Sequence, residues 1–258
     1  MLRAGGHSPW FARPPEKGAP RRVFCFSFAG GNASTYRSWQ ALAGARAEIC
    51  AIQLPGRADR LLEQPLEALA DVVGAVAREI NLLDPAPFVV FGHSLGALLA
   101  FELARLLQSA GLPLPEHLFV SACDAPQRRR PLRRVHDLPA DQLKSVLQEY
   151  AATPPAVLAN DELMELVLPA VRADFRMAFD YRYRKAELLR IPITVLAGCD
   201  EHDPDALEVT MWREETQRGF KVHWFKGGHF FILDHDRAIV DSVLGDWSAM
   251  AQSHAVTK

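Results

Sequence analysis

The sequence has few cysteines, no strong excess of either charge and no long hydrophobic run. Only four of the 258 residues are cysteines, and their wide spacing predicts buried free thiols in a reducing compartment rather than disulfides or metal ligands. The net charge of −2 gives no reason to expect nucleic acid as a partner. No apolar stretch is long enough to span a membrane, and the first residues lack the apolar segment of a signal peptide. We therefore expect a cytoplasmic protein that does not use a membrane.

The chain also lacks internal repeats and low-complexity tracts. Hydrophobic residues make up 49% of it and charged residues 23%, which suits one well-buried core. We expect a single domain over residues 1–258, present as a monomer. Residues 1–20 are rich in proline and glycine and predict an extended arm, pinned by Trp10 and Phe11.

Stretches with strand character alternate with stretches of helical spacing over most of the chain. Strands are expected at 23–28, 49–54, 88–91, 117–121, 193–197 and 220–225. Helices are expected at 35–43, 66–82, directly after 94, 204–217 and 236–250. This order predicts the α/β class, with a mostly parallel central sheet and helices on both faces.

The alternation stops between residues 124 and 186. Helix-like pieces separated by prolines occur there at 139–150, 161–168 and 169–182, and no strand pattern interrupts them. An all-helical insertion at this point of an α/β chain predicts a lid over the active site.

A G-x-S-x-G pattern joins the buried strand at 88–91 to the helix that follows it. Ser94 lies between Gly92 and Gly96, at a junction where a strand turns sharply into a helix. This arrangement is typical of the nucleophile elbow of α/β-hydrolases, in which the serine backbone is strained and its neighbours approach too closely for a Cβ. Because the strand and helix flank the motif correctly, the sequence predicts the α/β-hydrolase fold, with Ser94 as nucleophile.

A nucleophilic serine needs a general base and an acid that orients the base. In α/β-hydrolases these follow in the order serine, acid, histidine, each after a later strand. Asp200 directly follows the strand ITVLAG, and His229 lies between paired glycines and two phenylalanines after the strand that ends at Phe225. We therefore expect Asp200 as the acid and His229 as the base.

Each of these roles has an alternative. Asp203 and Asp205 are the nearest rivals for the acid. His235 is the rival base, but it lies at the start of the last expected helix and has no flanking glycines. His93, inside the elbow, is expected to pack beside the serine.

The oxyanion hole should combine two backbone N–H groups. One belongs to Leu95, the residue after the nucleophile, and the other comes from the first loop. We expect Ala29 to supply it, because Gly30 and Gly31 follow directly and allow a tight turn whose N–H groups face a ligand.

Seven segments spread over nearly the whole chain match one enzyme family. They read WFARP, FCFSFAGGNASTYRSW, AIQLPGRADR, FGHSLGALLAFELAR, LPAVRADFRMAFDYRYR, ITVLAGCDEHD and GGHFFI. The LPGR segment at 54–57 and the RADF segment at 172–175 are the most specific, because they separate this family from generic esterases. The chain thus resembles the type II thioesterases, the free-standing editing enzymes of polyketide and nonribosomal peptide assembly lines.

The resemblance implies a substrate and a division of roles. The substrate would be an acyl group held as a thioester on the phosphopantetheine arm of an acyl or peptidyl carrier protein domain. By position, the family's triad falls on Ser94, Asp200 and His229, and its oxyanion donors fall on Ala29 and Leu95. Such an enzyme would need no cofactor and no metal of its own.

The sequence differs from many members of the family just before Ala29. Many members have Pro-His before the Ala-Gly-Gly, where this chain has Ser27-Phe28, so we expect a more apolar wall. Phe28 is thus a candidate for the acyl chamber, together with Phe175, Met177 and Phe179 of the lid. The alternative for each lid residue is ordinary packing inside the lid.

An arginine cluster follows the strand at 117–121. Carrier proteins are often acidic, so Arg128, Arg129 and Arg130 are candidates for a docking strip at the lid entrance. A solvated loop face is the alternative interpretation.

Three other functions compete with the editing thioesterase. A general carboxylesterase would need the same triad, and only the LPGR and RADF segments argue against it. A thioesterase domain that releases or cyclises a finished product is disfavoured, because the chain has no attached carrier domain and no D-S-L-like phosphopantetheine attachment motif. A non-catalytic partner of a synthase is the least favoured, because Ser94, Asp200 and His229 are all present.

Overall fold

The computed structural model describes residues 8–129, 132–150, 153–201 and 207–255. A six-stranded sheet, in which neighbouring strands are parallel, forms its centre, with the strand order β2-β1-β3-β4-β5-β6. The strands are β1 (Arg22–Phe26), β2 (Glu48–Ala51), β3 (Phe88–His93), β4 (Leu118–Ser121), β5 (Ile193–Gly198) and β6 (Phe220–Phe225). The α/β class predicted from the sequence is thereby confirmed.

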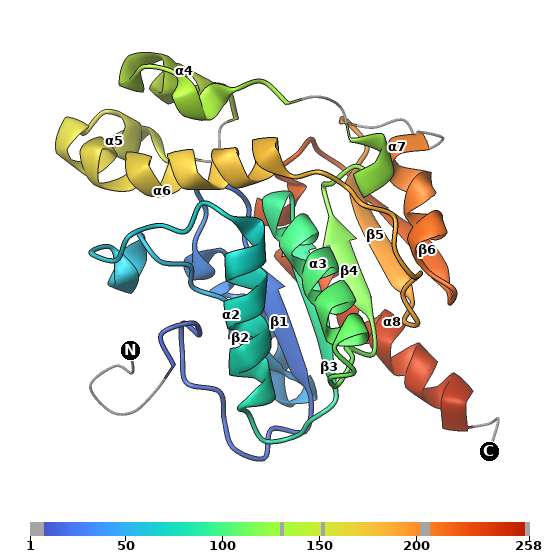
Figure 1. Ribbon diagram of the computed structural model, residues 1–258. Helices are drawn as coiled ribbons and strands as arrows, with labels where there is room; N and C mark the ends of the chain where they lie inside the picture. The colour runs from blue at the N-terminus through green and yellow to red at the C-terminus, as the bar shows by residue number, and fades with distance from the viewer. Residues whose placement is uncertain (1–7, 130–131, 151–152, 202–206, 256–258) are drawn as a thin grey trace.

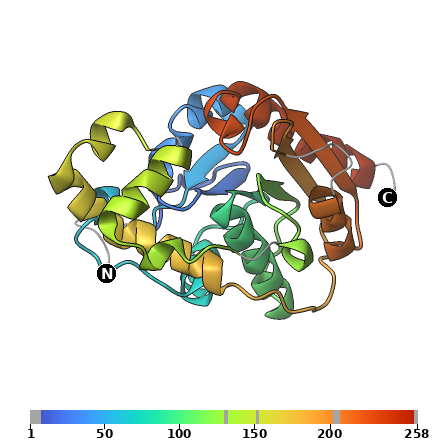
Figure 2. The ribbon, with the colours of Figure 1, turned by 90° about the horizontal axis from the view of Figure 1, so that it is seen from above.

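Helices cover both faces of this sheet (Figures 1 and 2). They are α1 (Trp39–Ala43), α2 (Leu69–Asn81), α3 (Leu95–Ser109), α4 (Ala140–Tyr150), α5 (Pro155–Leu158), α6 (Asp161–Asp180), α7 (Leu207–Thr210) and α8 (Asp236–Ala255). Helices α2 and α3 pack on one face, and α1 and α8 pack on the other. None of the helices in the described ranges is long and apolar enough to cross a membrane.

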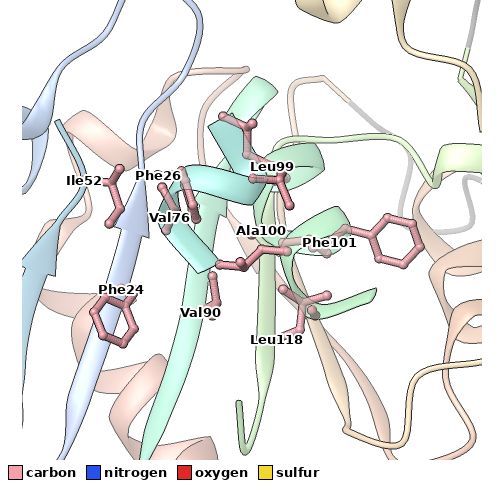
Figure 3. Close-up of a cluster of buried hydrophobic side chains, with 14 of the residues drawn as sticks. Phe24, Phe26, Ile52, Val76, Val90, Leu99, Ala100, Phe101 and Leu118 are labelled. Atoms are coloured by element: carbon pink, nitrogen blue, oxygen red, sulfur yellow. The ribbon is translucent and has the colours of Figure 1, made fainter. Parts of the chain in front are cut away.

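Strand β1 shows why both faces must be covered. Phe24 and Phe26 point into the core beneath α2 and α3, whereas Val23 and Cys25 point into the core beneath α1 and α8. Figure 3 shows part of the first of these cores, with Phe26 next to Val76 of α2. Each fully buried phenylalanine stabilises the fold by about 2–3 kcal/mol, and a strand apolar on both sides is stable only between two helix layers.

The strand order reverses direction between β1 and β3. The chain passes from β1 outward to β2, then crosses back and places β3 on the other side of β1. In open α/β sheets, ligands bind beyond the carboxyl ends of the strands at such a switch point. The loops after β1 and β3 are those that carry the predicted oxyanion residue and the predicted nucleophile.

Helices α4, α5 and α6 lie between β4 and β5 in the chain and across the carboxyl end of the sheet in space (Figure 1). Helix α6 is one continuous helix, although the sequence predicted two pieces that meet at Pro169. A proline inside a helix costs about 3 kcal/mol. Burial on both sides of it offsets this cost, because Leu168 packs toward α4 and Met177 packs into the main core.

Two other expected helices were wrong in extent. The helix expected at 35–43 divides into a 3₁₀ turn at Ala33–Tyr36 and the short α1, which ends at Gly44 with a φ of 58°. The helix expected at 204–217 is reduced to α7 and a 3₁₀ turn at Met211–Glu215, and residues 202–206 lie outside the described ranges.

All four cysteines are free. Cys25 and Cys50 are buried, Cys123 is half-buried, and Cys199 is exposed. The expectation of buried thiols was therefore wrong for Cys199, because the turn after β5 leads its side chain out of the sheet.

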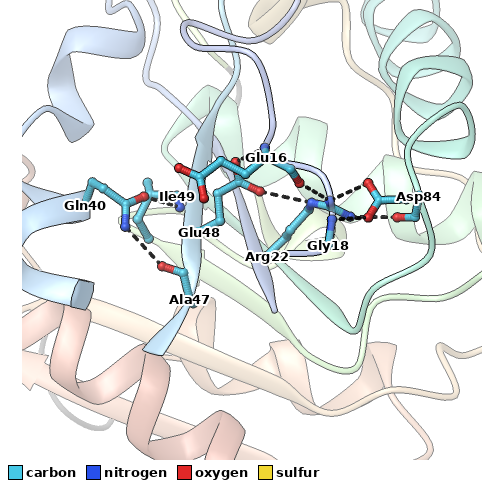
Figure 4. Close-up of polar contacts among 8 residues, drawn as sticks. All are labelled: Glu16, Gly18, Arg22, Gln40, Ala47, Glu48, Ile49 and Asp84. Atoms are coloured by element: carbon cyan, nitrogen blue, oxygen red, sulfur yellow. Dashed lines mark hydrogen bonds and ion pairs between the residues drawn. The ribbon is translucent and has the colours of Figure 1, made fainter. Parts of the chain in front are cut away.

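The arm before β1 is held by a buried arginine at the first position of the strand. Arg22 is 2% exposed and donates hydrogen bonds to the carboxylates of Glu48 and Asp84 and to the backbone carbonyls of Glu16 and Asp84 (Figure 4). The Gly18 N–H donates to the other Asp84 oxygen. One guanidinium thus joins the arm, β1, β2 and the loop after α2.

Replacing Arg22 with methionine should lower the free energy of unfolding by about 3 kcal/mol, because it leaves a partly buried carboxylate pair without its cation. Arg190→Met is the matched control: it removes an ion pair between two exposed side chains, Arg190 and Glu187, and should cost less than about 1 kcal/mol. Urea unfolding of both variants measures the difference, and equal losses would contradict the role assigned to Arg22.

A polar network lies near the amino ends of β4 and β5. His117 Nε2 lies 2.9 Å from Thr194 Oγ1, which donates to Asp246, and Asp246 also pairs with His223 Nε2 at 2.8 Å. Burial lowers the pKa of His117 to about 4, and it lowers the pKa of the fully buried His93 well below the usual histidine range. Both imidazoles are therefore neutral in the native protein near neutral pH.

This neutrality predicts a stability that falls with acidification. The unfolded chain binds protons at these histidines from about pH 6.5 downward, whereas native His117 does so only near pH 4, so stability is lost as the pH falls between these values. His117 alone accounts for about 3 kcal/mol over that window. In His117→Gln the slope of unfolding free energy against pH should decrease by about 1 kcal/mol per pH unit between pH 7 and 5. Urea titrations at pH 7, 6 and 5 measure it, and an unchanged slope would refute the assignment.

Candidate active site

Ser94 occupies a strained turn between β3 and α3. Its φ of 57° is unfavourable for a residue with a side chain, and its N–H is fixed by the Ser121 carbonyl at 2.8 Å. A Cβ on Gly92 would lie 2.0 Å from the Gly96 carbonyl oxygen, and one on Gly96 would lie 2.3 Å from the Phe26 carbonyl oxygen. Both glycines of the motif are therefore required by close backbone approach, and the turn raises the hydroxyl above the sheet.

His229 lies directly over the serine. Its Nε2 is 2.9 Å from Ser94 Oγ, which is hydrogen-bond distance for a general base. The loop reaches this position because Gly227 adopts a φ of 113° and packs against Gly198. A Cβ on Gly198 would lie only 2.5 Å from the Gly227 carbonyl oxygen. The Phe230 ring meets the imidazole edge-on, with ring centroids 4.9 Å apart, and helps to fix its orientation.

The carboxylate that contacts His229 is not that of Asp200, the residue expected from the sequence. The carboxylate beside His229 Nδ1 is that of Glu201, at 2.7 Å, and Asp200 points elsewhere with an exposed side chain. The reason is the turn after β5: the Asp200 N–H donates to the Gly227 carbonyl, so the backbone at 200 runs along the histidine loop and the next side chain faces the imidazole. The alternatives Asp203 and Asp205 lie outside the described residues.

The rival histidines have other partners. His235 Nε2 lies 2.8 Å from the Lys226 carbonyl oxygen, away from the serine. His93 is completely buried, with its Nδ1 2.9 Å from Ser121 Oγ, and its ring meets that of His229 edge-on at 5.6 Å. Burial, followed by the proximity of His229, lowers the pKa of His93. A neutral His93 packs beneath the base without opposing a positive charge on it.

Two residues beside the serine have backbone N–H groups without a partner among the described residues. Ala29 and Leu95 both line the cavity there, and neither N–H is hydrogen-bonded to another described residue. The turn at Ala29 needs its glycines: Gly30 has a φ of 76°, and a Cβ on Gly31 would lie 2.1 Å from Ser27 Oγ. Both N–H groups therefore remain available for the oxyanion hole that the sequence predicts.

A cavity of about 380 Å³ opens above the serine, between the sheet and the helical insertion. Phe28 and Phe175 line it, as do Leu98 and Tyr150, which the sequence analysis did not single out. The Phe28 ring packs edge-on against Phe230, with ring centroids 5.0 Å apart, and forms an apolar wall.

The other two chamber candidates lie elsewhere. Met177 is buried in the main core beneath α6, and Phe179 packs on His136 with ring centroids 5.1 Å apart. Because successive residues of a helix point 100° apart, only one face of α6 reaches the cavity, and Phe175 and Ala178 lie on it.

The arginine cluster divides between surface and cavity. Arg128 is exposed, whereas Arg129 is half-buried, lines the cavity and donates to the Ala178 carbonyl at 3.2 Å. Arg133 also lines the cavity, and Arg130 lies outside the described residues. Among the residues with assigned positions, no group of histidine, cysteine, aspartate and glutamate side chains has the geometry of a metal site.

These features together define a serine hydrolase of the α/β-hydrolase class. Comparison with known proteins narrows this: the model of the thioesterase domain family matches residues 21–249. The gramicidin S biosynthesis protein GrsT of Aneurinibacillus migulanus is 38% identical over 233 residues, which are 90% of this chain and 91% of GrsT. The chain therefore belongs to the thioesterase domain family.

Solved structures agree with this assignment. The type II thioesterase BorB from the borrelidin biosynthetic cluster superimposes with a TM-score of 0.84 and 37% identity, over 93% of this chain and 99% of BorB. The RedJ thioesterase from the prodiginine pathway of Streptomyces coelicolor has a TM-score of 0.79 and 31% identity, over 92% of each chain. The predicted resemblance to type II thioesterases and the predicted hydrolase fold are thereby confirmed.

The contacts of His229 predict how two neighbouring carboxylates differ. Glu201→Gln should lower kcat by about 10³- to 10⁴-fold, because an amide at Nδ1 no longer favours the tautomer in which Nε2 accepts the serine proton. Asp200→Asn, the matched control one residue away, should change kcat by less than about threefold. Steady-state hydrolysis of p-nitrophenyl acetate measures both. The opposite ranking would restore Asp200, and two neutral variants would move the role to Asp203 or Asp205.

Proposed function

We propose that this type II thioesterase hydrolyses acyl thioesters on the phosphopantetheine arm of carrier proteins, and so removes groups that stall or mis-prime an assembly line. The observation that carries the proposal is the 2.9 Å contact between Ser94 Oγ and His229 Nε2, opposite two unused backbone donors in a cavity roofed by helices. The similarity to type II thioesterases supports the choice of a thioester as the substrate.

The residues supply each step of an acyl-enzyme mechanism. His229 takes the proton of Ser94 as the hydroxyl oxygen attacks the thioester carbonyl, and the Ala29 and Leu95 N–H groups hold the resulting oxyanion. The carbon–sulfur bond then breaks, and His229 returns the proton to the departing thiol. Water, deprotonated by the same histidine, attacks the acyl-serine and releases the acid. Glu201 holds the Nδ1 proton and stabilises the imidazolium during both halves of the cycle.

The cavity has room for a short acyl group. Its volume of about 380 Å³ must hold the acyl chain together with the end of the pantetheine arm. Phe28, Leu98 and Phe175 make its wall largely apolar, and Arg129 and Arg133 make one part of its edge basic. Apolar walls suit an alkyl chain, and the basic edge suits the acidic surface of a carrier protein or the phosphate of its arm.

Acetyl- or propionyl-loaded carrier protein should be hydrolysed with a kcat/KM at least about tenfold above that of p-nitrophenyl acetate, because binding of the carrier and its arm contributes to the transition state. Ser94→Ala should lower both rates by about 10³-fold or more. Free acetyl-pantetheine is the control that separates thioester chemistry from recognition of the carrier.

Other outcomes would identify the alternatives. Preference for the free ester would support a general carboxylesterase. Preference for a long peptidyl or polyketide thioester, with cyclic product, would support a product-releasing enzyme.

A further inference from the structure

A buried ion pair joins the LPGR and RADF segments. Arg57 of the first and Asp174 of the second are 117 residues apart in the chain. The Arg57 Nη1 and Nη2 groups donate to the two oxygens of Asp174 at 2.5 and 2.8 Å, in the bidentate geometry that gives the strongest pairing. Asp174 is 0% exposed and Arg57 is 7% exposed. Neither residue takes part in the proposed steps of the reaction.

Both partners of this pair also bind the oxyanion loop, the turn after β1 that contains Ala29, Gly30 and Gly31. The Gly30 N–H donates to Asp174 Oδ2 at 2.7 Å, and Arg57 Nη1 donates to the Gly31 carbonyl at 3.0 Å. The peptide group between Ala29 and Gly30 and the peptide group between Gly31 and Asn32 are therefore each fixed by a charged side chain from another part of the chain. Ala29, whose N–H remains unbonded among the described residues, lines the cavity.

From this placement we propose that Arg57 and Asp174 are positioning residues, which fix the oxyanion loop to helix α6 and keep the local charge neutral for the oxyanion. The inference rests on the proposed function in one respect, the use of the Ala29 N–H as a donor. It assigns a purpose to the two segments that distinguish the sequence from those of generic esterases.

Stability alone does not account for such a pair. Replacing a buried ion pair by apolar side chains is often neutral or stabilising, so a fold that needed only packing here would not require charges. A hydrogen-bond donor in an oxyanion hole, in contrast, stabilises the transition state because its orientation is fixed before the reaction. Loss of one such donor costs about 10²- to 10³-fold in kcat. Loosening a donor should cost less than losing it.

The two charges have unequal effects on the reaction. The Asp174 carboxylate accepts the N–H of the residue after Ala29, so without its cation it would oppose the negative charge that forms at the hole, in a region of low dielectric constant. Arg57 cancels that charge. Removal of Arg57 should therefore slow the reaction more than neutralisation of Asp174, because an asparagine can still accept the Gly30 N–H.

The test compares kcat and KM of four purified variants for p-nitrophenyl acetate, a substrate that depends on the hole and the triad but not on a carrier protein. Arg57→Met should lower kcat by about 10- to 100-fold with KM within about threefold of wild type. Asp174→Asn should lose less, and the double variant should recover part of the kcat lost in Arg57→Met. Arg22→Met is the matched control, an equally buried guanidinium at the amino end of the sheet, and should leave kcat within about twofold.

Three results would overturn the proposal: an Arg57→Met kcat within about threefold of wild type, an equal loss in Arg22→Met, or a double variant slower than Arg57→Met. If Arg57→Met does not fold, Arg57→Lys replaces it. Lysine keeps the charge without the bidentate geometry, and the expected loss in kcat is then about tenfold, while an unchanged kcat again overturns the proposal. Failure of the carrier-bound substrate, with this ester pattern intact, would overturn the proposed function alone.

Discussion

The structure depends on one close approach of backbone, where β1, β3 and α3 meet. Gly92 lies against the Gly96 carbonyl, and Gly96 lies against the Phe26 carbonyl, with no room for a Cβ at either position. Only this contact lets α3 begin directly above β3 and hold Ser94 at a φ of 57°, a conformation that costs about 1–3 kcal/mol. Helix α3 offsets that cost, because it is buried on nearly every side between the sheet and its neighbouring helices.

The remaining site follows from the position of that turn. It lies beside the switch between β1 and β3, so the loop after β1 can supply a backbone donor while the loops after β5 and β6 bring the carboxylate and the imidazole. Contacts with other parts of the chain hold these loops in place. Gly198 and Gly227 pack together to place His229, and a helix from the insertion contacts the turn after β1 through Asp174.

What could be predicted from the sequence is what depends on local pattern. Alternating strands and helices gave the class of fold, and glycines beside Ser94 and His229 marked the two loops that present them. The sequence favoured Asp200 as the acid, and the contact of Glu201 with His229 could not be predicted, because the direction of a side chain in a turn depends on the strand beside it. The pairing of Arg57 with Asp174 depends on the path of the chain between them, and no local pattern encodes it.

Helix α6 belongs to two hydrophobic cores. Its second half, including Met177, packs into the main core against the sheet, while Met164, Leu168 and Val171 pack with α4 in a small core of their own. Pro169 lies within the stretch that packs with α4, so the break in backbone hydrogen bonding falls in the outer half of the helix. Leu147 and Tyr150 of α4 line the cavity on the side of this small core, so substitutions there can alter the shape of the chamber while the second half of α6 keeps its packing against the sheet. Mutations can therefore change which acyl group the enzyme accepts without changing its catalytic residues.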